Sequence, residues 1–204
     1  LVAAEEALQD ANIEITDENK YDVGCVIGSG IGAITTVVNA FKGFDAKGHK
    51  GVSPVIVPAL LHDGISARVS MANGLKGPNY NITAACATGN NAIGDAADII
   101  RMGRAKVMVA GGSEACIMPV VISGFNNMKV LTHDEDIPER ASRPFDVERG
   151  GFVAAEGAGL LILEDLDHAL ARGATIYAEL TGYGHTSDAF HVTAPNPDGE
   201  DAAE

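Results

Sequence analysis

The sequence predicts an α/β fold, and three observations lead to that class. Segments with strand-like and helix-like apolar patterns alternate along the chain. The run at 106–112, Lys-Val-Met-Val-Ala-Gly-Gly, is short and almost continuously apolar, which is typical of a parallel strand covered on both faces. Apolar residues make up 46% of the chain and glycines number 24, whereas aromatic residues reach only 5%. Such a composition suits layered helices and strands joined by tight turns.

The first elements follow from apolar spacing and from the positions of the glycines. Residues 1–11 place apolar side chains on one helical face and predict a helix. The apolar run 22–27 predicts a buried strand, and the glycine-rich segment 28–33 leads from it into a helix that ends near Phe41. We expect a loop at 42–53, where three glycines stand among charged residues.

The middle of the chain contains the segment around which we expect the rest to be organised. A helix at about 60–71 and a turn at Gly77–Pro78 precede a short strand that leads to Cys86. After Cys86, apolar residues recur at helical spacing until Gly103, which ends the predicted helix.

The later part of the chain predicts fewer regular elements. Residues 113–150 are polar and irregular. Beyond them, 157–163 predicts a strand, 165–172 a helix and 174–183 a last strand, and the final residues 198–204 resemble the start of a helix. Neither end resembles a signal peptide or a natural terminus, so we expect a fragment of a longer protein.

Charge and cysteine content exclude several classes of function. The net charge of −14 argues against a nucleic-acid-binding protein, which would present a basic face. No apolar run approaches the ~20 residues that a membrane span needs. Cys25, Cys86 and Cys116 are far apart and form no CxxC pair, so they predict neither a metal site nor a disulfide framework. Free cysteines fit a reducing compartment, and we expect a cytoplasmic protein.

Cys86 is the candidate nucleophile. A strand that turns sharply into a helix places this residue at or near the helix N-terminus, where unpaired N–H groups and the helix dipole favour the thiolate. Its neighbours are small, which would let a substrate carbonyl approach closely. The alternative is an inert buried thiol, because free cysteine is often buried. Cys25 and Cys116 fit that alternative, and Cys86 does not.

Two other patterns invite functional interpretations. The segment 28–33 satisfies the dinucleotide pattern G-x-G-x-x-G/A, with Asp45 at about the right distance, but the second strand that should carry the acid is missing. A plain tight turn is the alternative. His185, Asp188 and His191 could bind a metal, yet their spacing matches no standard zinc motif. We predict a hydrogen-bonded loop and no metal there.

Four motifs in order link the chain to a family. They are Thr83-Ala84-Ala85-Cys86-Ala87-Thr88-Gly89, Val107-Met108-Val109-Ala110-Gly111-Gly112-Ser113-Glu114, Ala141-Ser142-Arg143-Pro144-Phe145-Asp146, and Gly151-Phe152-Val153 with Glu156-Gly157-Ala158-Gly159. Through them the chain resembles the type II β-ketoacyl-[acyl-carrier-protein] synthases of fatty-acid synthesis, from residue 1 to about 203.

The resemblance implies a thiolase-like fold of two α/β halves in layers α-β-α-β-α. This chain would be an incomplete first half at 1–173 and the start of the second half at 174–204. The family's first strand, expected near the middle of the first sheet, would precede Leu1. A sheet with such a gap leaves backbone groups unpaired, so we expect the isolated chain to be poorly stable.

The activity implied by the resemblance is a decarboxylating Claisen condensation. Cys86 would take an acyl group from a pantetheine thioester, and its backbone N–H would donate to the oxyanion. The phosphopantetheine would arrive on the acyl carrier protein, so we expect no bound cofactor. In the family, the two histidines that handle malonyl decarboxylation belong to the second half, and the chain alone should be inactive.

The resemblance also implies roles for other residues and a homodimer with the strand before Cys86 near its two-fold axis. Ile31 would gate the acyl pocket, Phe125 would line its wall, and Ile56 and Val121 would shape the acyl tunnel, with the bulk of Val121 favouring a shorter acyl group. A loop near the pocket mouth would contain Asp188, His191 and Thr193. Basic contacts with the carrier protein would come from Lys50 and Lys129.

Three alternatives remain. A polyketide-type ketosynthase shares the fold and the cysteine, although the serine-rich tract usual after its nucleophile is absent at 87–91. A chain-length-factor subunit would lack the nucleophile, so Cys86 argues against it. An NAD-dependent dehydrogenase, the class that 28–33 would indicate, belongs to a different fold and chemistry.

Overall fold

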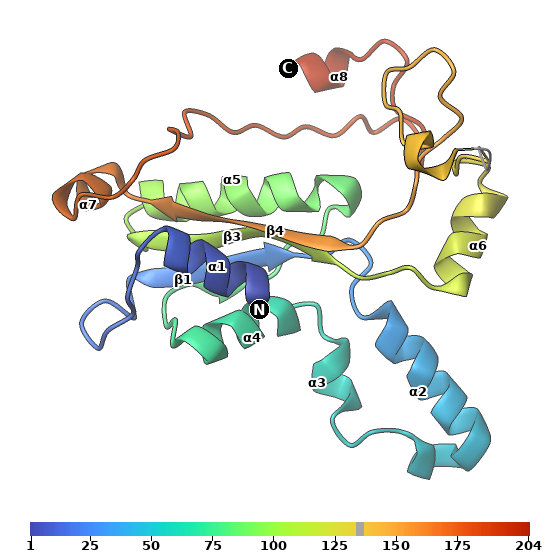
Figure 1. The fold of residues 1–204 in the computed structure, drawn as a ribbon, viewed down its shortest axis with the longest axis horizontal. Helices are drawn as coiled ribbons and strands as arrows, with labels where there is room; N and C mark the ends of the chain where they lie inside the picture. The colour runs from blue at the N-terminus through green and yellow to red at the C-terminus, as the bar shows by residue number, and fades with distance from the viewer. Residues whose placement is uncertain (134–136) are drawn as a thin grey trace.

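A four-stranded mixed sheet forms the centre of the molecule, with strand order β2-β1-β3-β4 (Figure 1). The computed structural model describes residues 1–133 and 137–204. The strand β1 (Val23–Gly28) pairs in parallel with β2 (Asn79–Tyr80) on one side and with β3 (Val107–Glu114) on the other. On the far side of β3, β4 (Gly157–Glu164) pairs in the antiparallel direction.

Helices cover both faces of the sheet and bury its apolar residues. The helix α5 (Thr88–Arg101) packs on one face, and α1 (Val2–Asp10) and α4 (Gly64–Asn73) pack on the other (Figure 1). Successive residues of a strand point to opposite faces, so Cys25 joins the cluster under α1 and α4 while Val26 joins the cluster under α5. Every residue of β1 is buried, as expected for a strand covered on both sides.

The remaining helices lie outside these layers. In Figure 1, α2 and α3 extend away from the sheet as an arm, and neither helix contains a buried residue. None of the helices in the described ranges combines the length and apolar character needed to cross a bilayer. The outer elements are α2 (Ile34–Lys47), η1 (Gly48–Gly51), α3 (Ile56–Leu60), η2 (Ala85–Ala87), α6 (Pro119–Asn127), η3 (Pro138–Arg140), α7 (Leu166–Ala171) and α8 (Glu200–Ala203).

Two predicted loops contain helices. The predicted loop at 42–53 is wrong, because α2 continues to Lys47 and η1 follows it. A Cβ atom on Gly43 would lie 2.2 Å from the Gly51 carbonyl oxygen, so these glycines permit a close backbone crossing. The prediction of irregular structure throughout 113–150 is also wrong, since α6 forms with Pro119 in its first turn.

The helix predicted at about 60–71 is divided into α3 and α4. Leu61 lies between them with extended backbone angles, φ −66° and ψ 133°, which no helix can continue through. The other helices and strands predicted before residue 173 are confirmed within a few residues of their predicted ends.

The last predicted strand, 174–183, is wrong. The segment is extended but pairs with no strand of the described chain, and it runs alongside α5 instead (Figure 1). Arg101 donates from Nη2 to the carbonyl of Leu180 at 3.1 Å, and the Tyr183 ring packs against Gly94. Extended backbone becomes a strand only where a neighbouring strand completes its hydrogen bonds. The division between 173 and 174 stays a prediction.

The expected gap in the middle of the sheet is also wrong. Pairing between β1 and β3 runs without interruption from Val23↔Val107 to Gly28↔Gly112, and β3 pairs with β4 along its whole length. The described sheet is therefore continuous, and its helical layers form one α-β-α unit. This unit corresponds to one half of the predicted layered fold.

An ion-pair cluster closes the end of the sheet where β4 meets α7. Glu164, whose side chain is 9% exposed, accepts hydrogen bonds from Arg172 Nε at 2.6 Å and Nη2 at 2.7 Å. Its Oε1 also accepts from His168 Nδ1 at 2.5 Å. Burial raises the pKa of Glu164, but the hydrogen bonds and charges of Arg172 and His168 outweigh burial and hold that pKa below its usual value.

Because of this cluster, we expect the stability of the fold to decrease at acidic pH. Because the pKa of Glu164 is lower in the folded than in the unfolded state, where it is about 4.3, the cluster stabilises the fold above that pH. The contribution is lost as the pH falls through the folded pKa. We expect Glu164→Gln to lower the free energy of unfolding at pH 7 by about 1–3 kcal/mol, measured by urea denaturation. At about pH 3 the difference between wild type and variant should shrink.

A matched variant separates this effect from general loss of charge. Asp17 pairs with Lys20 at 2.6 Å, but its side chain is 95% exposed, so Asp17→Asn should leave the free energy of unfolding unchanged. Two results would contradict a stabilising role of the Glu164 carboxylate. One is an equal loss of unfolding free energy in both variants, and the other is a loss in Glu164→Gln that does not change with pH.

Candidate active site

Cys86 lies in the 3₁₀ turn η2, between β2 and the helix α5, and is exposed. The preceding residue, Ala85, has a positive φ of 46°, a conformation that a residue with a Cβ atom rarely adopts. Strained backbone of this kind is concentrated at functional sites. The predicted turn from strand to helix is confirmed, while the role of Cys86 stays a prediction.

The two other cysteines lie in chemically unreactive surroundings. Burial raises the pKa of Cys25 to about 12, even though Ser66 offers a hydrogen bond. Cys116 is buried as well, and burial followed by the charges of Glu114 and Glu156 raises its pKa. A thiol is reactive as its thiolate, so these two groups are poor nucleophiles. Cys86 is the one exposed cysteine of the chain.

Side-chain hydrogen bonds fix the Cys86 turn to the end of β1. Asn81 donates from Nδ2 to the Ile27 carbonyl at 2.7 Å, and Thr83 donates from Oγ1 to the Ser29 carbonyl at 3.1 Å. Inside the turn, the buried Thr88 accepts from the Ala84 N–H at 2.8 Å. These bonds satisfy backbone groups that the β1–β2 ladder no longer pairs.

Ser66 of α4 joins β1 and β2 where their ladder ends. Its hydroxyl is fully buried, accepts from the Ile27 N–H at 2.9 Å and donates to the Tyr80 carbonyl at 2.9 Å. Asn79 then donates to the Ser66 carbonyl at 3.0 Å. Sequence reasoning missed Ser66, although a polar residue within a mostly apolar helical pattern was the available signal.

The glycine-rich segment 28–33 is tied to β3 by an internal carboxylate. Glu114 accepts from the Gly30 N–H at 2.8 Å, from the Ile31 N–H at 3.0 Å and from the Ser29 hydroxyl at 2.8 Å. In a dinucleotide-binding loop such N–H groups would face a phosphate. Here they are occupied, and Asp45 lies inside α2 rather than at the end of a strand. The tight-turn interpretation is confirmed.

The structure places Ile31 beside the Cys86 turn. A Cβ atom built on the adjacent Gly30 would lie 3.2 Å from the Ala85 carbonyl oxygen, so the two loops are in contact. Ile31 itself is 36% exposed.

The other residues that the family resemblance assigned to the acyl pocket lie on outer elements. Ile56 begins α3, and Val121 and Phe125 lie on α6, well apart from α3 in Figure 1. The Phe125 ring packs edge-on against Phe152 at 5.1 Å between centroids. The structure therefore does not bring Ile56, Val121 and Phe125 into one pocket. Exposed positions in η1 and just after α6 are occupied by Lys50 and Lys129.

Residues 184–199 form the hydrogen-bonded loop that the sequence predicts. His191 Nδ1 accepts from the N–H groups of Thr193 and Ala194, both at 3.1 Å, and Asp188 accepts from the Asn196 N–H at 2.8 Å. Within the ranges that the structure describes, no three His, Cys, Asp or Glu side chains are placed to hold a metal ion. The loop begins beside the first turn of α5, where His185 and Ala87 line the same open groove.

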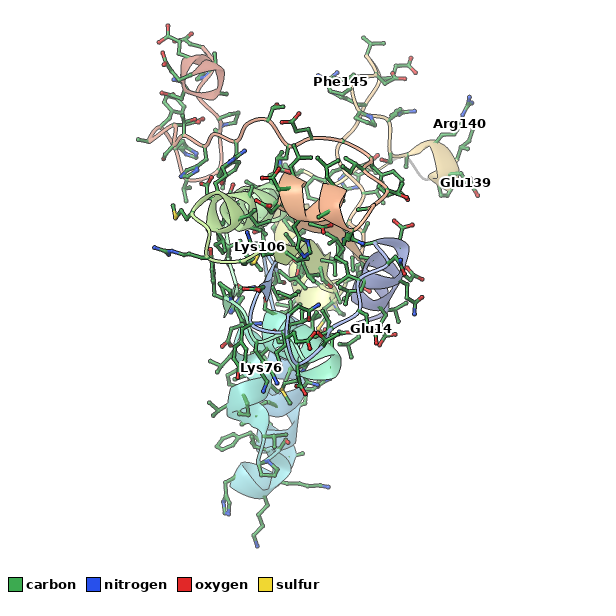
Figure 2. The ribbon with its side chains drawn as sticks, turned by 90° about the vertical axis from the view of Figure 1, so that its left-hand side faces the viewer. Glu14, Lys76, Lys106, Glu139, Arg140 and Phe145 are labelled. Atoms are coloured by element: carbon green, nitrogen blue, oxygen red, sulfur yellow. The ribbon has the colours of Figure 1, made fainter. Side chains whose placement is uncertain are left out.

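The motif at 141–146 forms an exposed loop after η3. Phe145 is 99% exposed with a φ of 66°, and Figure 2 shows its side chain projecting away from the helical and sheet layers. Arg140 and Glu139 of η3 project from a neighbouring part of the same region (Figure 2). Ala141, at the start of the motif, is buried, so the loop is anchored at one end and exposes Phe145 at its tip.

Comparison with known proteins gives a consistent result. A family model described as "Beta-ketoacyl synthase, N-terminal domain" matches residues 1–169. The 3-oxoacyl-[acyl-carrier-protein] synthase 2 of Rhizobium meliloti (strain 1021) is 48% identical over 204 residues, covering 99% of this chain and 48% of the relative. The protein of the same name from Staphylococcus aureus (strain N315) is 48% identical over 200 residues, covering 98% of this chain and 48% of its own length. The chain spans about half the length of these curated relatives.

Solved structures agree on the fold. A type II polyketide ketosynthase complex with its acyl-carrier protein, bound to a hexaketide, matches with a TM-score of 0.91 and 36% identity, covering 98% of this chain and 51% of that chain. A β-ketoacyl synthase from Burkholderia phymatum STM815 matches with a TM-score of 0.86 and 35% identity, covering 97% and 48%. The predicted thiolase-like fold, with this chain as about its first half, is confirmed.

Proposed function

This chain belongs to the β-ketoacyl synthase family, and we propose that its Cys86 carries the acyl group in a decarboxylating Claisen condensation of fatty-acid biosynthesis. The observation that carries the proposal is the contrast among the cysteines. Cys86 is exposed on a strained turn at the start of α5, whereas Cys25 and Cys116 are buried with raised pKa values.

The proposed reaction has two steps that share one nucleophile. The Cys86 thiolate attacks an acyl thioester, and the pantetheine thiolate leaves and takes up a proton. A malonyl thioester then loses CO2, its α-carbon attacks the acyl carbonyl, and the Cys86 thiolate is expelled. Among the residues that the structure describes, the Cys86 N–H has no hydrogen-bond acceptor, so it is available to an oxyanion.

The acyl carrier protein is the proposed donor of both thioesters. The related ketosynthase complex contains a carrier protein. Lys50 and Lys129 offer exposed positive charge to an acidic partner, although the net charge of −14 opposes a close approach. Phosphopantetheine would enter as part of that partner, and this chain would bind no cofactor of its own.

Assembly and location are also proposals. In the described sheet, β2 is an edge strand and lies next to the Cys86 turn. We propose that two copies of the protein pair along this edge in a homodimer. We propose a cytoplasmic location because all three cysteines are free thiols. The family resemblance places the decarboxylation histidines in a second half, so this chain alone should not complete a condensation.

Fatty-acid elongation is favoured over polyketide synthesis by the degree of similarity. The relatives named 3-oxoacyl-[acyl-carrier-protein] synthase 2 are 48% identical to this chain, compared with 36% for the polyketide ketosynthase.

Labelling tests the proposal directly. We expect an acyl-pantetheine thioester or cerulenin to modify Cys86 alone, with Cys25 and Cys116 unmodified as internal controls, because only Cys86 is exposed. Digestion and peptide mass mapping would locate the label. Failure to modify Cys86, together with measurable NAD binding, would instead support the dehydrogenase alternative.

A further inference from the structure

Glu114 ends β3 and forms a second, unassigned part of the Cys86 environment. Its Oε2 accepts from the backbone N–H groups of Gly30 and Ile31 at 2.8 and 3.0 Å, and its Oε1 accepts from the Ser29 hydroxyl at 2.8 Å. Ser29 is 3% exposed and accepts in turn from the Gly32 N–H at 2.9 Å. One carboxylate therefore organises the loop that follows β1.

The same loop is packed against the Cys86 turn. A Cβ atom on Gly30 would lie 3.0 Å from Glu114 Oε2 and 3.2 Å from the Ala85 carbonyl oxygen, so Gly30 fits tightly between the carboxylate and the turn. At the far end of the loop, Gly32 has a φ of 72° and packs against the His62 imidazole. Gly30 and Gly32 are therefore closely packed on either side of Ile31, which restricts the backbone that carries it.

We propose that Glu114 is a positioning residue for acyl transfer, which holds Ile31 beside Cys86 and so sets the room available to the acyl group. This inference rests on the proposed function, because the position of Ile31 can affect acyl transfer only if Cys86 carries the acyl group. Glu114 would act through the loop and would not touch the substrate.

The chemistry of the site requires a carboxylate. Three donors converge on Glu114, and an ionised carboxylate offers acceptors on both oxygens. Glutamine has nearly the same shape but presents one oxygen and one NH2 group. In Glu114→Gln, the amide oxygen can serve either the two backbone N–H groups or Ser29, and the hydrogen bonds that remain are uncharged and weaker.

A carboxylate at the opposite end of the same pair of strands provides the control. Glu114 pairs with Gly157 in the β3–β4 ladder, whereas Glu164 pairs with Val107 at the other end. Both carboxylates accept several hydrogen bonds, so Glu164→Gln also removes stabilising contacts, but far from Ile31. Glu164→Gln therefore reports the effect of lost stability without a change at the loop.

Hydrogen exchange tests the positioning without requiring any activity. We expect Glu114→Gln to speed exchange of the Gly30 and Ile31 amides by about tenfold, because their acceptor weakens. Glu164→Gln should leave those amides as in the wild type. Unchanged exchange in Glu114→Gln, or equal acceleration in both variants, would overturn the proposal.

A double-mutant cycle tests whether Glu114 acts through Ile31. The measured quantity is the rate of Cys86 acylation by a two-carbon thioester divided by the rate with an eight-carbon thioester. We expect Glu114→Gln to change this ratio by about fivefold or more in the wild-type background and by less than about twofold beside Ile31→Ala. Equal changes in the two backgrounds, or no change in either, would overturn the specificity role. Absence of acylation in every protein while the exchange result holds would count against the proposed function alone.

Discussion

Replacing Cys86 with serine is expected to lower the rate of acyl-enzyme formation by at least about a thousandfold. A serine hydroxyl needs an adjacent general base to act as a nucleophile, whereas a cysteine supplies some thiolate at neutral pH without one. Among the described residues, Cys86 has no hydrogen bond to a histidine or carboxylate, so that part of the chain offers no such base to a serine at this position. The measurement is the intact mass of the protein after incubation with an acyl thioester.

Cys116→Ala is the matched control for this prediction. Cys116 is buried and its pKa is raised by burial first and by Glu114 and Glu156 next, so its removal should leave acylation within about twofold of the wild type. Acylation that persists in Cys86→Ser and disappears in Cys116→Ala would show that Cys116 is the nucleophile and would contradict the proposal for Cys86.

Local sequence patterns were sufficient to predict the centre of the fold. The runs that became β1, β3 and β4 are apolar and bounded by glycine or charge, and the residues after Cys86 have helical spacing. Patterns failed where a segment's structure depends on distant contacts. The sequence predicts Gly43 within a loop, because local spacing does not indicate its close approach to Gly51.

The residues of the candidate site also differ in whether local sequence patterns indicate them. Cys86 could be identified locally, since its small neighbours and its place before a helical pattern are adjacent in the chain. Ser66 and Glu114 could not, because their hydrogen-bond partners Ile27 and Gly30 lie 39 and 84 positions away. Only the order of the strands brings these residues together, so the sequence indicates a candidate nucleophile but not the side chains whose hydrogen bonds hold its surroundings in place.

Gly28 at the end of β1 is a position where we expect a small substitution to do large structural damage close to Cys86. A Cβ atom on Gly28 would lie 2.1 Å from Thr88 Cγ2 and 2.6 Å from the Ile82 carbonyl oxygen. Thr88 cannot move freely, because it is buried and accepts the Ala84 N–H at 2.8 Å. An alanine must therefore displace the first turn of α5 or the segment between β2 and Cys86.

We expect Gly28→Ala to lower the free energy of unfolding by about 2–4 kcal/mol and to slow the acylation of Cys86 by about tenfold or more. The ladder partner of Gly28 supplies the control: a Cβ atom on Gly112 would meet its nearest neighbour, Gly89 Cα, at an ordinary 3.5 Å. Gly112→Ala should change the unfolding free energy by less than about 1 kcal/mol. Urea denaturation and acylation kinetics of both variants test this prediction. Equal losses of unfolding free energy and acylation rate in the two variants would mean that the close packing of Gly28 against Thr88 does not position Cys86.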